Sequence, residues 1–153
     1  MGRAGRIGVV AGIGVAGAIA LALAPRIPQD PSYHAFADDR TILGVPNFFD
    51  VASNVLFAVG GALGARLVVR RPPEGDGWIR TSWERVAWAV VFAGVGLTAF
   101  GSSWYHLAPS NDRLFWDRLP MAVAFTALLV IVVAELIGPR AGRALLLPAV
   151  LGG

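Results

Sequence analysis

Long apolar stretches with almost no charge, separated by short polar segments, dominate the chain. Residues 7–24 contain no charged side chain, and a helix of this length rises about 27 Å, close to the roughly 30 Å hydrocarbon core of a bilayer. Residues 51–69, 86–106 and 119–138 have comparable length, and each contains at most one Arg or Glu. A helix satisfies its own backbone hydrogen bonds in lipid. The pattern therefore predicts an all-α, polytopic transmembrane bundle with four complete spans.

A last apolar run, residues 144–153, has ten residues and is too short to cross a bilayer. We expect it to be the start of an incomplete fifth span, and the chain to be a truncated version of a longer protein. The whole chain, residues 1–153, is then a single transmembrane domain. Within the second span, Gly60 and Gly64 have the four-residue spacing that lets membrane helices pack closely.

The distribution of charge predicts the orientation of the bundle. Only 15% of the residues are charged, whereas a soluble domain carries roughly a quarter. All 13 basic residues are Arg, and nine of them fall on the cytoplasmic side if the N-terminus is cytoplasmic, as the positive-inside rule requires. We therefore expect a multi-pass protein of a bacterial inner (plasma) membrane, whose basic charge serves topology and not binding of nucleic acid. The Arg residues expected inside are Arg3, Arg6, Arg66, Arg70, Arg71, Arg80, Arg85, Arg140 and Arg143, and those expected outside are Arg26, Arg40, Arg113 and Arg118.

The first apolar stretch admits two other interpretations. It could be a signal peptide ending at residues 22–24, but Pro25 would follow the cut and block it, so we favour an uncleaved anchor. Residues 12–17 match the G-x-G-x-x-G fingerprint of dinucleotide-binding folds, and Asp38 lies about where the ribose-binding acid would. That fingerprint requires an amphipathic helix after the glycines, whereas no polar residue follows them before Pro25. We therefore interpret the stretch as a membrane helix.

Polar residues gather at the outer ends of the second, third and fourth spans. Ser102 and His106 are four residues apart, so both project from one face of their helix. Asp117 follows after a short loop, and the hairpin between the two spans allows it to approach His106. Taken alone, Asp117 is as readily explained as a capping acid at the start of the fourth span. Because burying ionisable groups in a membrane is costly, together they form a candidate functional site.

A second set of polar residues lies at the start of the second span. Asn47, Asp50 and Asn54 have spacings that place them along one helical stripe. Such a stripe serves either a binding site or hydrogen bonds between helices. The preceding outer segment, residues 33–40, adds Asp38 and is a lid, part of a cation site or a solvated loop.

The motifs of these spans resemble a known family. The sequence Gly-Ser-Ser-Trp-Tyr-His of residues 101–106, with Asp117 eleven residues after the His in Trp-Asp-Arg-Leu-Pro-Met, is similar to the alkaline ceramidases. Their superfamily also includes the adiponectin-receptor-like proteins. Residues 47–54 are similar to the segment that opens an early ceramidase helix, and the whole resemblance covers roughly residues 33–135.

The resemblance implies a seven-helix bundle that holds zinc and hydrolyses the amide of ceramide, or of a related N-acyl lipid, to a sphingoid base and a fatty acid. By the same resemblance, His106 would be a zinc ligand and Ser102 would help to polarise the carbonyl of the lipid substrate. Asp117 would orient or deprotonate the attacking water. It also implies a calcium site to which Asp38 and Asn47 would contribute.

The chain departs from the family pattern in its histidines. The family completes the zinc site with a His-x-x-x-His pair on a late helix, whereas the other His of this chain, His34, is isolated. A catalytic zinc usually has three protein ligands, so we expect this chain alone to be inactive. Calcium has only partial support, because Tyr33 and Phe36 stand where acids are expected. The alternative function is a non-catalytic, receptor-like or structural membrane protein, and the sequence indicates no oligomeric state.

Overall fold

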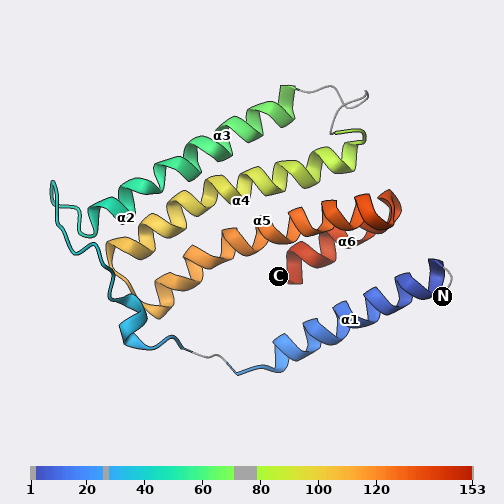
Figure 1. Cartoon of the computed structure of the whole chain (residues 1–153), viewed down its shortest axis with the longest axis horizontal. Coiled ribbons are helices and arrows are strands. Elements are labelled where there is room, and N and C mark those ends of the chain that lie inside the picture. Colours follow the sequence, from blue (N-terminus) through green and yellow to red (C-terminus); the bar gives the residue numbers. More distant parts are fainter. Residues whose placement is uncertain (1–2, 26–27, 71–78, 153) are drawn as a thin grey trace.

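The protein is built from helices lying side by side in one elongated layer (Figure 1). The computed structural model describes residues 3–25, 28–70 and 79–152. No β-strand occurs in these ranges, and the prediction of an all-α fold is confirmed. The helices are α1 (Arg3–Leu23), α2 (Phe48–Ser53), α3 (Val55–Arg70), α4 (Ser82–Leu107), α5 (Asn111–Ile137) and α6 (Pro139–Gly152), and a short 3-10 turn, η1 (Pro31–His34), precedes α2.

Three helical segments of the described chain are long and apolar enough to cross a membrane. They are Phe48–Arg70, which joins α2 to α3, Ser82–Leu107 and Asn111–Ile137. The expected first span does form a helix, α1, and the expected fifth forms the 14-residue α6. The membrane character is thus supported by three segments, and the larger number of four spans and part of a fifth stays a prediction.

Helices α3 and α4 approach so closely that their backbones touch. A Cβ atom built on Gly61 would lie 2.5 Å from the Cα of Gly96, and Gly64 lies against the ring of Phe92. Only glycine permits this distance. The predicted close packing therefore occurs through Gly61 and Gly64, whereas Gly60 has no neighbour nearer than a Val95 methyl at 4.0 Å.

The contact between α4 and α5 also depends on glycine. Gly101 lies against the carbonyl oxygen of Trp116, where any Cβ atom would overlap that oxygen. Pro120 has no N–H to offer this carbonyl, which would otherwise accept the hydrogen bond of residue 120 within α5. The close approach places the neighbouring residues Ser102 and Asp117 beside the same contact.

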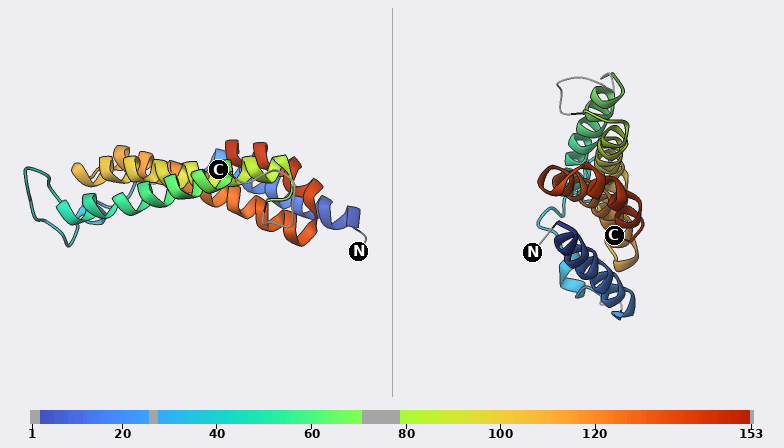
Figure 2. Two further views of the ribbon diagram at one scale, coloured as in Figure 1. Left: turned by 90° about the horizontal axis from the view of Figure 1, so that it is seen from above. Right: turned by 90° about the vertical axis from the view of Figure 1, so that its right-hand side faces the viewer.

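Helix α6 folds back along the half of the layer that holds the start of α4 and the end of α5. Gly138, with a φ of 140°, connects it to α5, and Leu146 of α6 joins a buried cluster with residues of α4 and α5. Gly142 fits against Trp83 and Ala134. By contrast α1 stands apart from the layer in Figure 1, and in the right-hand view of Figure 2 it lies on the side of the molecule away from α3. Every α1 residue whose exposure is described is exposed.

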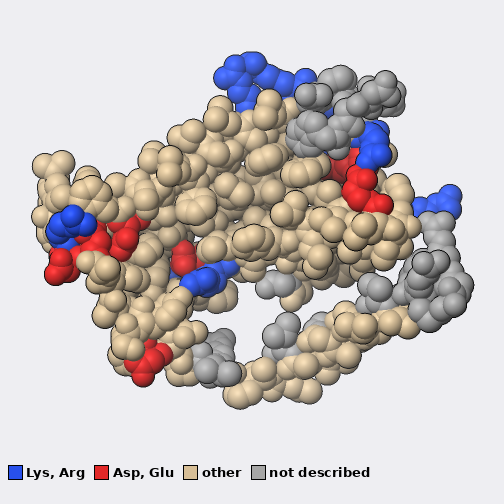
Figure 3. All heavy atoms as spheres, in the orientation of Figure 1, with Lys and Arg blue, Asp and Glu red and all other residues tan. Residues whose placement is uncertain are grey.

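Charged side chains gather toward the two ends of the helices, with an uncharged belt between them (Figure 3). The antiparallel order places the end of α3, the start of α4 and the end of α5 on the same side. Arg70, Arg80 and Arg140 therefore share one end, as the charge pattern predicted. Arg71, also expected there, lies outside the described residues.

Candidate functional site

The predicted polar residues meet where α4 ends, beneath the segment that precedes α2. His106 is in the last turn of α4, and Asn47 is the N-cap residue that precedes α2. The side-chain Nδ2 of Asn47 donates a hydrogen bond of 2.7 Å to the carbonyl oxygen of His106. Because that carbonyl lies in the last turn and lacks a helical donor, Asn47 joins the end of α4 to the start of α2.

The imidazole of His106 lies in a partly enclosed position with one nitrogen unpaired. Its Nδ1 is 3.7 Å from Oδ2 of Asp50, which is too long for a hydrogen bond, and this nitrogen is buried without a hydrogen-bond partner. The ring of Phe36 covers it with a centroid distance of 4.6 Å. An orphaned buried nitrogen is costly, so it is a ready acceptor for a proton, a water molecule or a metal ion.

The predicted stripe on the second span divides in two. Asn47 and Asp50 reach the end of α4, whereas Asn54 turns back and donates to the carbonyl oxygen of Asp50 at 3.1 Å. Asn54 marks the break between α2 and α3 and is only 4% exposed. Asn54 therefore stabilises the junction between α2 and α3, and this contact supports a structural role and not a binding role.

Ser102 and Asp117 are both buried at the contact between α4 and α5. Each is 6% exposed, and Oδ2 of Asp117 is 3.5 Å from Nε of Arg118. The alternative that Asp117 caps its helix is wrong, because α5 begins at Asn111 and Ser110 is its N-cap. Asp117 instead faces inward from the second turn. The expected approach of Asp117 to His106 does not appear among the ion pairs of the described residues, where the carboxylate near His106 is that of Asp50, at 3.7 Å.

Sequence reasoning missed a buried tyrosine, Tyr105, that connects this site to the outer segment. Its hydroxyl lies 2.8 Å from Nδ1 of His34, at hydrogen-bond distance, and the side chain is 3% exposed. The ring of Phe36 contacts Tyr105 edge-on at 5.6 Å. The available signal was its helical spacing, because Tyr105 follows Ser102 by three residues and so faces the same side.

Three sets of contacts hold residues 29–36 over the end of α4 and the start of α5. His34 bonds to Tyr105, the hydroxyl of Tyr33 bonds to Arg118, and the backbone of Gln29 exchanges two hydrogen bonds with the side chain of Asn111. The segment thus covers the end of α4 and the start of α5, with the ring of Phe36 against His106. Of the three interpretations of the outer segment, the contacts favour a lid.

Asp38 has a structural partner for each of its oxygens. Oδ1 accepts from Nε of Arg40 at 2.6 Å, and Oδ2 accepts from the backbone N–H of Phe49 at 2.8 Å. Burial raises the pKa of this carboxyl, but the hydrogen bonds to Arg40 and Phe49 and the charge of Arg40 outweigh burial and lower the pKa overall. With both oxygens engaged, Asp38 ties the lid to α2, and a role in binding calcium has no support in this geometry.

The described residues fit only part of a zinc site. The unpaired Nδ1 of His106 is a suitable donor, and Asp50 is the nearest carboxylate. No group of three or more His, Cys, Asp or Glu side chains in the described ranges is arranged to hold a metal. A catalytic zinc usually needs three protein ligands, so these residues do not complete one.

Comparison of the chain with family models, curated proteins and solved structures gave no match, so the resemblance to the ceramidases depends on the motifs of this chain alone.

Proposed function

We propose that the protein is a membrane-embedded amide hydrolase of the alkaline ceramidase type. The proposed reaction cleaves ceramide or a related N-acyl lipid by water, breaking the C–N bond and forming a fatty acid and a sphingoid amine. The observation that supports it best is the buried, unpaired Nδ1 of His106, beside a carboxylate at the end of an apolar helix. Membrane helices rarely retain such a group without a ligand.

The proposed roles follow from chemistry of the residue types. His106 would contribute one zinc ligand, the hydroxyl of Ser102 would donate to the amide oxygen, and Asp117 would orient the attacking water and accept its proton. Zinc, when bound, polarises a carbonyl and lowers the pKa of water toward about 7. Nδ1 of His34 lies at hydrogen-bond distance from the hydroxyl of Tyr105, and its Nε2 is buried and unpaired, but no group of three such ligands is arranged around a metal in the described residues. We accordingly propose that this chain by itself does not hydrolyse the lipid.

The proposed arrangement in the membrane extends the three apolar segments to four spans and the start of a fifth. The N-terminus and the Arg-rich end would face the cytoplasm of a bacterium, and the site of His106 would lie near the outer face of the inner membrane. The orientation is supported by Arg70, Arg80 and Arg140, which lie at the same end of the helices. A site at that depth is accessible to a lipid from the side.

The test measures zinc content and lipid hydrolysis of the protein expressed from its complete gene and purified in detergent. We expect bound zinc and release of fatty acid from a ceramide labelled in its acyl chain, both lost in His106→Ala. His34→Ala removes the other histidine and serves as the matched control, with zinc retained. Full hydrolysis by His106→Ala, or an active protein without zinc, would refute the proposal.

A non-catalytic membrane protein is the second candidate. It is favoured by the internal pairing of the polar residues, since Asp38 bonds to Arg40, Asp117 lies beside Arg118 and Asn54 bonds within its own helix junction. On this alternative the polar cluster serves packing. A purified protein that binds a ceramide analogue without zinc and without releasing fatty acid would support it.

A further inference from the structure

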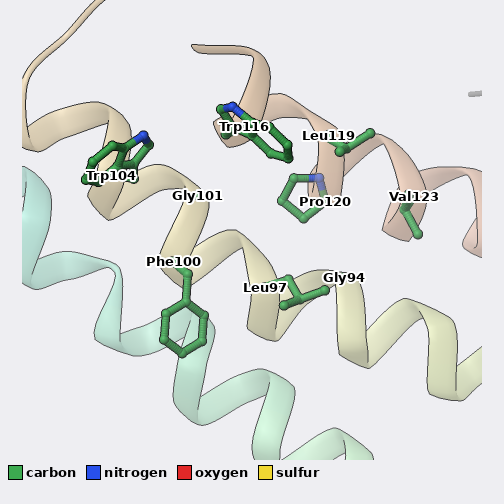
Figure 4. A pocket seen from close by; sticks show the side chains of 9 residues that line it. All are labelled: Gly94, Leu97, Phe100, Gly101, Trp104, Trp116, Leu119, Pro120 and Val123. Atoms are coloured by element: carbon green, nitrogen blue, oxygen red, sulfur yellow. The ribbon is translucent and has the colours of Figure 1, made fainter. Parts of the chain in front are cut away.

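Two apolar grooves flank one exposed ridge of α4. The groove between α4 and α5 has a volume of about 470 Å³ and includes Leu97, Trp104 and Trp116 in its lining. The groove between α4 and the α2–α3 pair has a volume of about 420 Å³. Phe100 and Trp104 line both grooves and so form the ridge that divides them. Figure 4 shows Phe100 on the α3 side of the first groove.

The ridge exposes more apolar area than its own helices can cover. Phe100 is 73% exposed and Trp104 is 50% exposed. Within the hydrocarbon belt these surfaces must be covered by apolar chains or by another protein surface. The first groove runs from Trp104 and Trp116 at one end to Val123 at the other, along the direction of the spans (Figure 4).

A basic residue stands at the tryptophan end of the grooves. The guanidinium of Arg113 lies 3.9 Å from the centroid of the Trp104 ring and donates to the carbonyl oxygen of Trp104 at 3.1 Å. Arg113 precedes Trp116 by three residues and Pro120 by seven, so it shares the groove face of α5. None of the ion pairs of the described residues includes Arg113. The contacts with Trp104 hold the guanidinium of Arg113 in place, and none of these ion pairs neutralises its charge.

We propose that this face binds one diacyl phospholipid, with an acyl chain in each groove and its phosphate on Arg113. Two grooves on either side of one ridge suit two chains joined at a single headgroup. The guanidinium donates two hydrogen bonds in a fork that matches phosphate oxygens. Tryptophans at the membrane boundary lie at the level of the headgroups, as Trp104 and Trp116 would here. Basic positions between membrane helices are known receptors of phospholipid headgroups.

The proposed lipid site is separate from the proposed hydrolytic site. Its residues, Leu97, Phe100, Trp104, Arg113 and Trp116, include none of the polar residues assigned to hydrolysis. The lipid would be a retained component of the fold and not a substrate. Loss of one site by mutation therefore leaves the other proposal standing.

Fluorescence quenching tests the site in detergent micelles. Phosphatidylglycerol brominated on both acyl chains quenches a tryptophan that it touches, so we expect quenching that saturates at one lipid per chain. The quenched fraction falls in Trp104→Phe and in Trp116→Phe. It rises in Trp83→Phe, because Trp83 packs against the buried cluster with α6 and its loss removes only unquenched emission.

The charge of Arg113 is tested by substitution. Arg113→Gln raises the half-saturating lipid concentration roughly fivefold, the effect of about one basic contact, whereas Arg143→Gln, at an exposed residue of α6, leaves it unchanged. Brominated diacylglycerol, which has no phosphate, is unaffected by either substitution. Circular dichroism confirms that the variants remain helical.

Three results would overturn the proposal. Quenching that rises without saturation and equally in all variants indicates only solvating lipid. If Arg113→Gln leaves the half-saturating lipid concentration unchanged, the proposed contact between Arg113 and the phosphate is refuted. A dimer by light scattering in which Trp104 and Trp116 are protected from the brominated lipid shows that a second copy of the chain covers the ridge.

Discussion

Asp38 illustrates how a buried charge can be structural. Its lowered pKa means that the folded state favours the carboxylate, so its stabilisation is fully present above the ordinary pKa of 3.8 and is lost as the pH falls through the lowered value. The hydrogen bonds to Arg40 and Phe49 are the cause. Acid should therefore release the link between the lid and α2.

We expect Asp38→Asn to be less stable than the parent protein at pH 7, because the amide lacks the charge that pairs with Arg40. The difference in midpoint of thermal unfolding should shrink as the pH falls below about 4, where the parent loses the same charge. Unfolding measured by circular dichroism between about pH 3 and pH 7 checks this. Asp39→Asn, at the exposed neighbouring residue, is the control and should show no such convergence.

At the residue scale, the sequence identified the polar residues at the helix ends better than it identified their contacts. Ser102, His106 and Asp117 were recognisable because polar side chains are costly at membrane depth. The approach of Asp50 to His106 depends on how α2 meets the end of α4, and the contact of His34 with Tyr105 depends on how residues 29–36 fold over α4. The contacts of residues 29–36 are made by single side chains without a repeating spacing, so no sequence pattern predicts which residues they join.

At the scale of elements, the apolar stretches predicted the helices but not all of their ends. The fourth span was predicted from residue 119, because Pro120 suits a first helical turn, yet α5 begins at Asn111. Proline is tolerated inside this helix because the carbonyl that it leaves unpaired, that of Trp116, lies against Gly101 of α4. The compensation is tertiary, so the sequence of one helix does not reveal it.

The packing of α3 on α4 yields a test with a built-in control. Gly61→Leu should destabilise the protein by roughly 1–3 kcal/mol or more, because a side chain there overlaps the backbone of Gly96. Gly60→Leu should have little effect, since a Cβ atom at that position has no neighbour nearer than a Val95 methyl at 4.0 Å. Both substitutions change the same residue type in adjacent positions of one helix.

The measurement is the midpoint of unfolding of purified protein in increasing SDS, followed by circular dichroism. Equal destabilisation by the two substitutions would contradict the assigned face of α3. A larger effect of Gly60→Leu would indicate that the predicted Gly60 and Gly64 spacing, and not Gly61, forms the helix contact.

At the scale of the whole molecule, the antiparallel order of α3, α4 and α5 separates the lid from the Arg-rich end. This separation makes the proposed orientation testable, because the chain contains no cysteine and any introduced thiol is unique. Asp39 belongs to the lid side and Arg140 to the opposite end, and both are exposed.

With the Arg-rich end in the cytoplasm, a membrane-impermeant maleimide should label Asp39→Cys in intact bacterial cells from which the outer membrane has been removed. Arg140→Cys should be labelled only after the inner membrane is opened with detergent. The energetic reason is that Arg is retained on the cytoplasmic side during insertion, and Arg85 in the first turn of α4 and Arg143 of α6 add to the basic charge at the end that holds Arg140. The inverse labelling pattern would place the lid and His106 inside the cell, and the substrate would then have to come from the inner leaflet.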